Sequence, residues 1–316
     1  MLLQDIYNVN QDSILYKESS YIKGIKQKII QDFKLDPKII KNNESIKFFD
    51  KKIFQNLSYK FDQKRTKILL EENSNNDFSS FLIKNGCIQK IENIDEKKIQ
   101  VNSLDNDVKL FEEKFMKYQD LFQKDYLINL NSVLLNNCYN YQFKKNTSQK
   151  IFIRHNTDNI ENTNYTRNFI NIDENSKIIL IEHFNNHVKS NENIFNFFEI
   201  KKNSELIHLI IQNNSFDSNL QFTTHANCYE NSKYKQVIFN TSNSSLRNHH
   251  YANLLEKNSN ADLKGVFFAS NNQIIDNKTQ INHLAELCQS NQKYKGILTD
   301  SAKASYLSKT HVDKIA

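Results

Sequence analysis

The amino-acid sequence predicts a mainly β protein with a helical N-terminal part. From about Lys145 onward, the helical periodicity of apolar residues disappears and short apolar runs take its place. These runs recur roughly every ten to fifteen residues, and clusters of Asn, Asp or Ser separate them. Such a rhythm is typical of short strands joined by tight turns. It suits a sandwich, a barrel or a β-solenoid equally well.

Some of the apolar runs, such as those at 178–181 and 209–211, are continuous instead of alternating. Continuous runs are typical of strands covered on both faces, or of strands that turn a corner in a solenoid. The chain has only four Gly residues. We therefore expect Asn residues between the runs to supply the left-handed backbone conformation that sharp corners need. The predicted strands contain the runs at 151–153, 169–172, 178–184, 194–200, 206–211, 237–239, 263–269, 273–275 and 295–298.

The first expected region, residues 1–66, is an N-terminal helical segment. A stripe of apolar residues with a spacing of about four predicts a helix that ends at Asp36-Pro37, because proline cannot continue it. The apolar positions of this helix are Tyr21, Ile22, Ile25, Ile29, Ile30 and Phe33.

The second expected region, residues 67–145, mixes strands and helices. Short runs at 68–70, 81–83 and 87–88 predict strands, and Asn85-Gly86 between the last two is a hairpin signal. Two helices should follow, the first of them behind a cap at Asp105 or Asn106. Their apolar stripes are Val108, Phe111, Phe115, Tyr118 and Phe122, and then Leu127, Leu130 and Leu134. The third region, residues 146–316, is the β core.

Composition excludes several classes of protein. The 42 basic and 36 acidic residues are spread along the chain, so the net charge of +6 predicts no nucleic-acid partner. The N-terminus has no signal-peptide pattern and no apolar run approaches ~20 residues, which predicts a soluble, cytoplasmic protein without a membrane partner. The four cysteines contain no C-x-x-C pair and should be reduced thiols. Phosphate-loop, dinucleotide, hydrolase and metalloprotease motifs are also absent, so we expect no catalytic residues.

Polar residues stand at fixed offsets within the last predicted strands. His283 and Cys288 could meet across a turn, and imidazole and thiolate are suitable iron ligands. The interpretation we favour is that both fill and hydrogen-bond the interior. Lys295 pairs with Asp276 or Asp300, or faces solvent. The polar residues of this series are Arg247, Asn248, Gln273, Asp276, His283, Cys288, Ser290, Gln292 and Lys295.

Strand geometry limits what neighbouring residues can do together. His249 and His250 should point to opposite faces and cannot easily ligate one metal, so we expect a solvated pair. Arg247 should satisfy carbonyl groups at the ends of neighbouring strands through its several donors. Glu182 and His183 also face opposite ways, so Glu182 lies either in an inward polar layer or on the surface.

These residues together resemble the later half of the SufB/SufD family, and the match is closest to SufD-like members. Arg247 and Asn248 lie where the family carries an L-R-x-N segment, and 283–295 resembles its H-x4-C-x-S-x-Q-x-x-K segment. The element Ile181-Glu182-His183-Phe184 and the pair Leu206 and His208 also resemble family strands. The resemblance implies a right-handed parallel β-helix flanked by helical segments, and it decides between the solenoid and the sandwich.

The resemblance also implies a function, that of a non-catalytic scaffold subunit in a SufBCD-type iron–sulfur cluster assembly complex. The implied partners are a SufB-like paralogue and a SufC-like ATPase, and the implied task is cluster assembly and iron acquisition. The chain would bind no cofactor firmly, and a cluster would be held only in the assembled complex. Family members continue past the position of Ala316 with further rungs and a helical region, so we expect a fragment or a truncated gene. The alternatives are a polysaccharide-acting β-helix enzyme and a pure protein-interaction solenoid.

Overall fold

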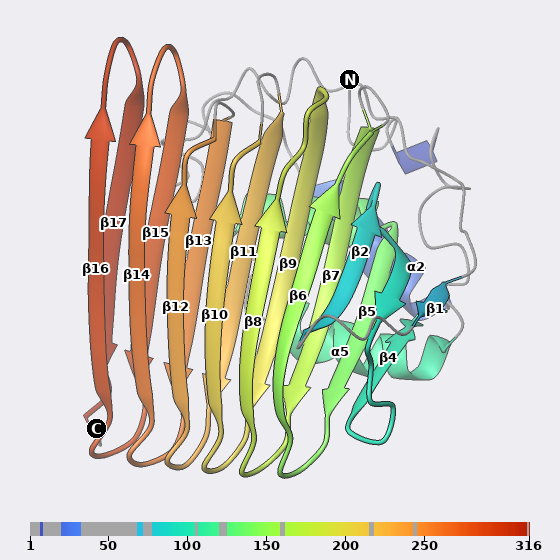
Figure 1. The fold of residues 1–316 in the computed structure, drawn as a ribbon, viewed down its shortest axis with the longest axis vertical. Coiled ribbons are helices and arrows are strands. Elements are labelled where there is room, and N and C mark those ends of the chain that lie inside the picture. Colours follow the sequence, from blue (N-terminus) through green and yellow to red (C-terminus); the bar gives the residue numbers. More distant parts are fainter. Residues whose placement is uncertain are drawn as a thin grey trace.

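The main body of the protein is a parallel β-helix made of two sheets that face each other (Figure 1). The computed structural model describes residues 7–8, 20–32, 68–71, 78–104, 107–119, 125–158, 162–214, 218–242, 245–314 and 316. The predicted fold class is therefore confirmed, and the solenoid is the correct choice over the sandwich and the barrel.

Consecutive strands from β5 to β17 alternate between the two sheets, so each turn of the β-helix contributes one strand to each. The nine-stranded sheet contains, in spatial order, β1 Leu69–Glu71, β3 Cys87–Glu92, β2 Ser79–Lys84, β6 Ser148–Asn156, β8 Lys177–Phe184, β10 Glu205–Gln212, β12 Lys233–Asn240, β14 Asn260–Ala269 and β16 Gln289–Leu298. The eight-stranded sheet contains β17 Lys303–Val312, β15 Ile274–His283, β13 Ser245–Leu254, β11 Asn219–Cys228, β9 Ser190–Ile200, β7 Asn162–Ile172, β5 Asn137–Phe143 and β4 Ile99–Ser103.

A repeat of about 28 residues underlies this alternation. Leu206 on β10 is in register with Ile178 on β8 and with Tyr234 on β12. Equivalent residues of successive turns, such as Ser176 and Ser204, stand 28 residues apart, and the backbone N–H of Ser176 donates to Oγ of Ser204. Since each turn contains two strands, the spacing of the apolar runs in the sequence is half of this repeat.

Asparagine supplies the left-handed backbone at one corner of five successive turns, as predicted, and Leu287 takes this position in the next turn. Asn175, Asn203 and Asn231 have φ angles of 57–58°, and Asn146 and Asn258 follow the same pattern. The amide groups stack into a ladder, because Nδ2 of Asn231 donates to Oδ1 of Asn203 at 3.0 Å and Nδ2 of Asn203 donates to Asn175 at 3.1 Å. Asparagine thus occupies the positive-φ positions that glycine usually takes.

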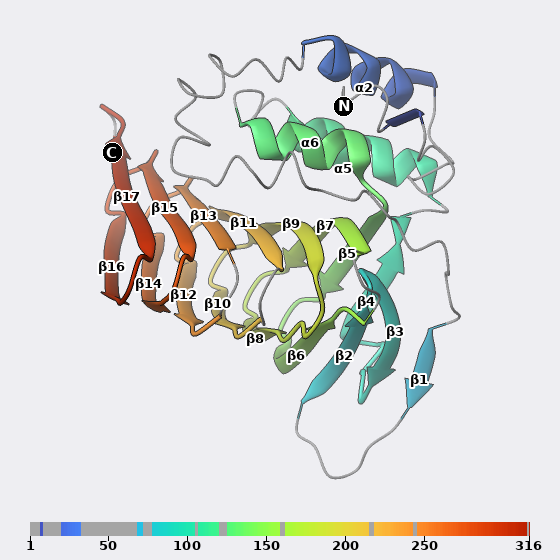
Figure 2. The same ribbon diagram turned by 90° about the horizontal axis from the view of Figure 1, so that it is seen from above.

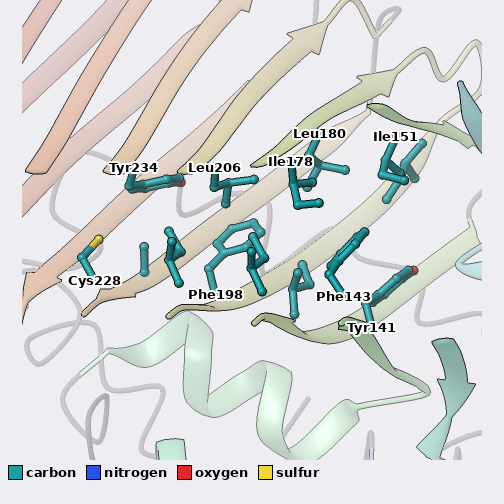
Figure 3. Packing of buried hydrophobic residues seen from close by; sticks show 14 of the residues in the cluster. Tyr141, Phe143, Ile151, Ile178, Leu180, Phe198, Leu206, Cys228 and Tyr234 are labelled. Atoms are coloured by element: carbon teal, nitrogen blue, oxygen red, sulfur yellow. The ribbon is translucent and has the colours of Figure 1, made fainter. Parts of the chain in front are cut away.

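A buried apolar core fills the space between the sheets (Figure 3). Phe198 from the eight-stranded sheet and Leu206 and Tyr234 from the nine-stranded sheet all belong to one cluster. Each of the three is at most 1 % exposed. Burial of these runs from both sheets is the main source of stability for the fold.

The helices that the structure describes lie on one face of the β-helix. The helices α2 Ser20–Asp32, α5 Val108–Gln119 and α6 Tyr126–Leu134 lie over the outer face of the eight-stranded sheet, and α5 and α6 run across its strands (Figure 2). On α5, Phe115 and Tyr118 pack against Phe169 and Phe197 of the sheet. No described helix is long and apolar enough to cross a membrane.

Two details of the helical part differ from the prediction. The buried face of α2 carries Ile22, Lys26 and Ile30, whereas Tyr21 is 58 % exposed, so the helix is rotated relative to the predicted stripe. The cap of α5 is Asp107, whose Oδ1 accepts a hydrogen bond from the Leu110 backbone N–H at 3.0 Å. The predicted cap residues Asp105 and Asn106, and also Phe33, Pro37 and Phe122, lie outside the described residues.

The predicted hairpin is confirmed. Strands β2 and β3 pair antiparallel on either side of Asn85 and Gly86, which have φ angles of 51° and 81°. A Cβ on Gly86 would lie 2.7 Å from Nδ2 of Asn137, so glycine is needed at this position for space as well as for conformation. Strand β2 pairs parallel with β6, and β5 pairs parallel with β7, so both strands extend the two sheets of the β-helix.

Candidate functional site

The first polar cluster lies inside the β-helix and is centred on Glu182. Strand β8 alternates, so Ile178, Leu180, Glu182 and Phe184 face the interior. The apolar residues on both sides fix this register, because a shift by one residue would expose all of them. Glu182 is therefore buried, which selects the inward position from the two that the sequence left open.

Three side chains hold the Glu182 carboxylate. Nε2 of His155 lies 2.9 Å from Oε2, and Nε2 of His208 lies 2.9 Å from Oε1. Asn196, on the opposite sheet, donates to Oε1 at 2.6 Å. Burial alone would raise the pKa of Glu182, but the hydrogen bonds from His155 and His208 outweigh it and lower the pKa to about 2. The carboxylate is therefore charged at neutral pH and links both sheets.

This cluster continues along the axis of the β-helix. The register places Asn168, Asn196, Thr224, His250 and Thr279 in one inward row across the eight-stranded sheet. Nδ2 of Asn168 donates to Asn196 at 2.8 Å, and Oγ1 of Thr224 lies 2.8 Å from Nδ1 of His250. Burial holds the pKa of His250 well below its usual range, so this histidine is neutral at neutral pH. The polar interior is thus a connected row of groups instead of isolated side chains.

The second polar cluster lies on the outer face of the eight-stranded sheet. Asp125 caps helix α6, accepting from the backbone N–H of Leu127 at 3.0 Å, and its Oδ2 lies 2.6 Å from a terminal nitrogen of Arg247. On the same strand as Arg247, Nε2 of His249 lies 3.1 Å from Oδ2 of Asp276. Ser305 then donates to Oδ1 of Asp276 at 2.6 Å.

Electrostatics in this outer cluster favour one charge state. Burial, together with the nearby Arg247, lowers the pKa of His249 to about 4. Burial would raise the pKa of Asp276, but the hydrogen bond from His249 outweighs it and the pKa lies below the usual value. At neutral pH the cluster therefore contains a neutral imidazole between two carboxylates, one of which Arg247 neutralises. It ties the start of α6 to β13, β15 and β17.

Arg247 has a partner that the sequence did not predict. A terminal guanidinium nitrogen donates to the carboxylate of Asp125, and another lies 3.5 Å from Oγ1 of Thr223. Arg247 and Asp125 are 122 positions apart in the chain, and nothing in the local sequence signals their contact. The neighbouring histidines do face opposite ways, since His249 faces outward toward Asp276 and His250 faces inward toward Thr224. They are not the expected solvated pair, because both are at most 1 % exposed: α6 and Asp125 cover the outer position and the β-helix core encloses the inner one.

His283 and Cys288 bond different serine residues. Nε2 of His283 lies 2.8 Å from Oγ of Ser290, and Sγ of Cys288 lies 3.3 Å from Oγ of Ser259. Cys288 follows Leu287, which has a φ of 59°, just as Ser259 follows Asn258 at the previous corner. Cys288 thus takes the corner position that serine occupies elsewhere. Across the described ranges, no three His, Cys, Asp or Glu side chains are grouped so that they could hold a metal ion.

The remaining predicted residues serve turns and strand faces. Gln273 accepts from the backbone N–H of Ser270 at 2.6 Å and donates to the Ser242 carbonyl, so it braces a corner. Gln292 donates to Oγ1 of Thr310 at 3.0 Å. Lys295 is exposed on β16 and makes no ion pair with any residue the structure describes, so it faces solvent.

Sequence reasoning missed the partners of these residues. His155 and His208 share the inward parity of Glu182 on β6 and β10, and that parity is the signal that could have found them. It also missed Glu199, which is 3 % exposed and accepts from Lys117 at 2.8 Å and from Tyr118 on α5. Burial would raise the pKa of Glu199, but these hydrogen bonds lower it to about 2. Glu199 therefore anchors α5 to the sheet.

Comparison with known protein families identifies the family to which this β-helix belongs. The family model "SUF system FeS cluster assembly, SufBD core domain" matches residues 153–316, which is more than half of the chain and runs from β6 to the last residue. No curated protein matches the sequence. The matched segment contains nearly all of the paired turns, together with Glu182, Arg247 and most of both polar clusters. The chain belongs to the SufB/SufD family of the SUF system for iron–sulfur cluster assembly.

Proposed function

We propose that this protein is a SufD-like, non-catalytic scaffold subunit of a SufBCD-type complex in the cytoplasm. It pairs with a SufB-like paralogue and works with a SufC-like ATPase in cluster assembly and iron acquisition. The observation that carries the proposal is that the family's core domain coincides with the β-helix of this chain.

The two polar clusters support a scaffold role over a catalytic one. Glu182 is 1 % exposed, and its oxygens accept from side chains on three strands. Arg247 is fully buried against Asp125. Groups of this kind bond one another and stabilise a rigid shape, whereas a catalytic group must reach a substrate.

The iron–sulfur cluster is cargo of the complex in this proposal. The hydrogen bonds of His283 and Cys288 to two separate serine residues support this part of the proposal. A cluster would need further thiolate or imidazole groups, which the partner subunits would have to contribute.

Co-purification tests the proposal. The full coding sequence, with an N-terminal tag, is expressed together with a SufB-like and a SufC-like protein. We expect both to elute with the tagged chain in defined stoichiometry, and we expect the variant with His283→Ala and Cys288→Ala to retain them. A chain that elutes alone under conditions where the other two proteins associate would overturn the scaffold role and favour an interaction solenoid outside the SUF system.

A further inference from the structure

The outer face of the nine-stranded sheet carries an exposed apolar patch. Six large apolar side chains from four neighbouring strands point outward there, each 36–64 % exposed. Ile211, Phe239 and Val266 are in direct register across β10, β12 and β14. Phe268 is in register with Ile297 on β16. The members of this patch, called the β10–β16 patch below, are Ile211, Val237, Phe239, Val266, Phe268 and Ile297.

This exposure is unusual for a parallel sheet. Such sheets are normally covered on both faces, and their strands are apolar for that reason. The outer face of the opposite sheet obeys the rule, since α5 and α6 cover it and bury Phe169 and Phe197 (Figure 2). Over β10 to β16, no described helix covers the β10–β16 patch.

Positive charge borders the patch. Lys264 is in register with Val237, Lys295 with Val266, and Lys293 with Lys264. Lys264 pairs with Asp262 at 2.5 Å, but Lys293 and Lys295 make no ion pair with a residue in the described part of the chain. The border therefore offers two ammonium groups to an incoming carboxylate.

We propose that the β10–β16 patch binds an acidic amphipathic helix of another protein. The apolar face of that helix covers Phe239 and Val266, and its flanking carboxylates pair with Lys293 and Lys295. This interaction goes beyond the scaffold assignment, because it adds a partner on the sheet opposite the one that the described helices α5 and α6 cover.

The dimensions of a helix suit this surface. Neighbouring strands are about 4.8 Å apart, and one helical turn rises about 5.4 Å. A helix that runs across the strands therefore places residues i, i+4 and i+7 over successive strands, in the row of Ile211, Phe239 and Val266. Helices α5 and α6 run across the strands of the opposite sheet in this manner (Figure 2).

Two other occupants fit the patch less well. A second copy of the chain would bring its own Lys293 and Lys295 against the same positive border, which is repulsive. A membrane would have to bury side chains that lie on a flat sheet beside charged Lys264 and Asp262. An acidic amphipathic helix would cover the apolar side chains of the β10–β16 patch and would also pair with Lys293 and Lys295.

The probe for this proposal is a labelled synthetic peptide of about four helical turns, with Leu at i, i+4, i+7 and i+11 and Glu on both flanks. Its counterpart has Lys in place of every Glu. Fluorescence anisotropy with the full chain is expected to give binding for the Glu peptide at least tenfold tighter than for the Lys peptide. The preference should shrink in high salt, because the charges are exposed.

Matched variants locate the binding site. Val237→Thr together with Val266→Thr keeps branched strand formers and removes two outward methyl groups, so we expect affinity for the Glu peptide to fall about tenfold. Lys293→Glu together with Lys295→Glu should abolish the preference for the Glu peptide. The control is Val312→Thr, which changes a valine of the other sheet that is 60 % exposed and should leave affinity unchanged. Circular dichroism confirms that each variant is folded.

Several outcomes would overturn the proposal. These are equal affinity for the two peptides, equal loss in the Val312→Thr control, binding to phosphatidylserine vesicles without binding to the Glu peptide, and a dimer in sedimentation that the Val237→Thr and Val266→Thr changes dissociate. The patch variants should still co-purify with the SufB-like and SufC-like proteins, so a failure of this proposal and a failure of the scaffold role are separate results.

Discussion

Replacement of Glu182 by Gln tests whether the inner polar cluster stabilises the fold. The substitution keeps the shape of the side chain and removes its charge, leaving His155, His208 and Asn196 with a weaker acceptor. The lowered pKa of Glu182, from 4.5 to about 2, corresponds to about 3 kcal/mol of stability. Loss of one member of a buried charged network costs about 3–5 kcal/mol. We therefore expect Glu182→Gln to reduce the free energy of unfolding by about 3 kcal/mol at pH 7.

Urea unfolding followed by circular dichroism measures this effect. The matched control is Glu205→Gln, on the outer face of β10, where Glu205 pairs with Lys235 at 2.7 Å near solvent. Surface pairs of this kind contribute at most about 1 kcal/mol. Both variants carry the same change of Glu to Gln. The difference between their free energies of unfolding therefore reports the burial and the partners of Glu182.

The contribution of Glu182 to stability should also depend on pH. Because the folded pKa of Glu182 is below its unfolded value, its contribution is fully present above about pH 4.5 and is lost as the pH falls toward 2. The gap between the wild type and Glu182→Gln should therefore shrink in this window. Equal urea midpoints for Glu182→Gln and Glu205→Gln at pH 7 would refute the reasoning.

Three further predictions concern the corners and the buried histidines. Asn203→Val forces a branched residue into a φ of 58° and should lower the unfolding free energy by about 2 kcal/mol, whereas Asn203→Gly should cost less; thermal melts of both variants check this. Cys288→Ser restores the serine of the other corners and should change stability by less than about 1 kcal/mol, while Cys288→Val should cost more in the same melts. Burial lowers the pKa of His225 to about 4, so this residue should account for about 3 kcal/mol of the stability that the wild type loses as the pH drops from 6.5 to 4; a His225→Gln variant with an equally steep urea-midpoint profile would contradict the assignment.

Local patterns predicted those parts of the fold that local physics determines. The hairpin at Asn85-Gly86 and the left-handed asparagines could be read from single turns, because few residues adopt positive φ. Apolar runs located the strands because strands that face the core carry apolar side chains. The choice of a β-helix over a sandwich needed the family resemblance, since both folds bury similar runs.

Long-range contacts could not be predicted from one sequence. The partner of Arg247 is Asp125, and no periodic signal connects residues that are 122 positions apart. The rotation of α2 was missed because Ile25 and Ile29 compete with Ile22 and Ile30 for the core, and the buried Lys26 argues against the correct face.

The asparagine corners also affect the chemical ageing of the protein. An asparagine followed by serine is prone to deamidation, in which the backbone nitrogen of the serine attacks the side-chain amide and forms a succinimide ring. At three of these corners that nitrogen is engaged. The backbone N–H of Ser176, directly after Asn175, donates to Oγ of Ser204 at 3.1 Å, and those of Ser204 and Ser232 donate to the carbonyls of Lys201 at 3.1 Å and Tyr229 at 3.0 Å. These hydrogen bonds hold the nitrogens away from the reaction. A chain whose corners consist of its most labile residue type is thereby protected by its own repeat.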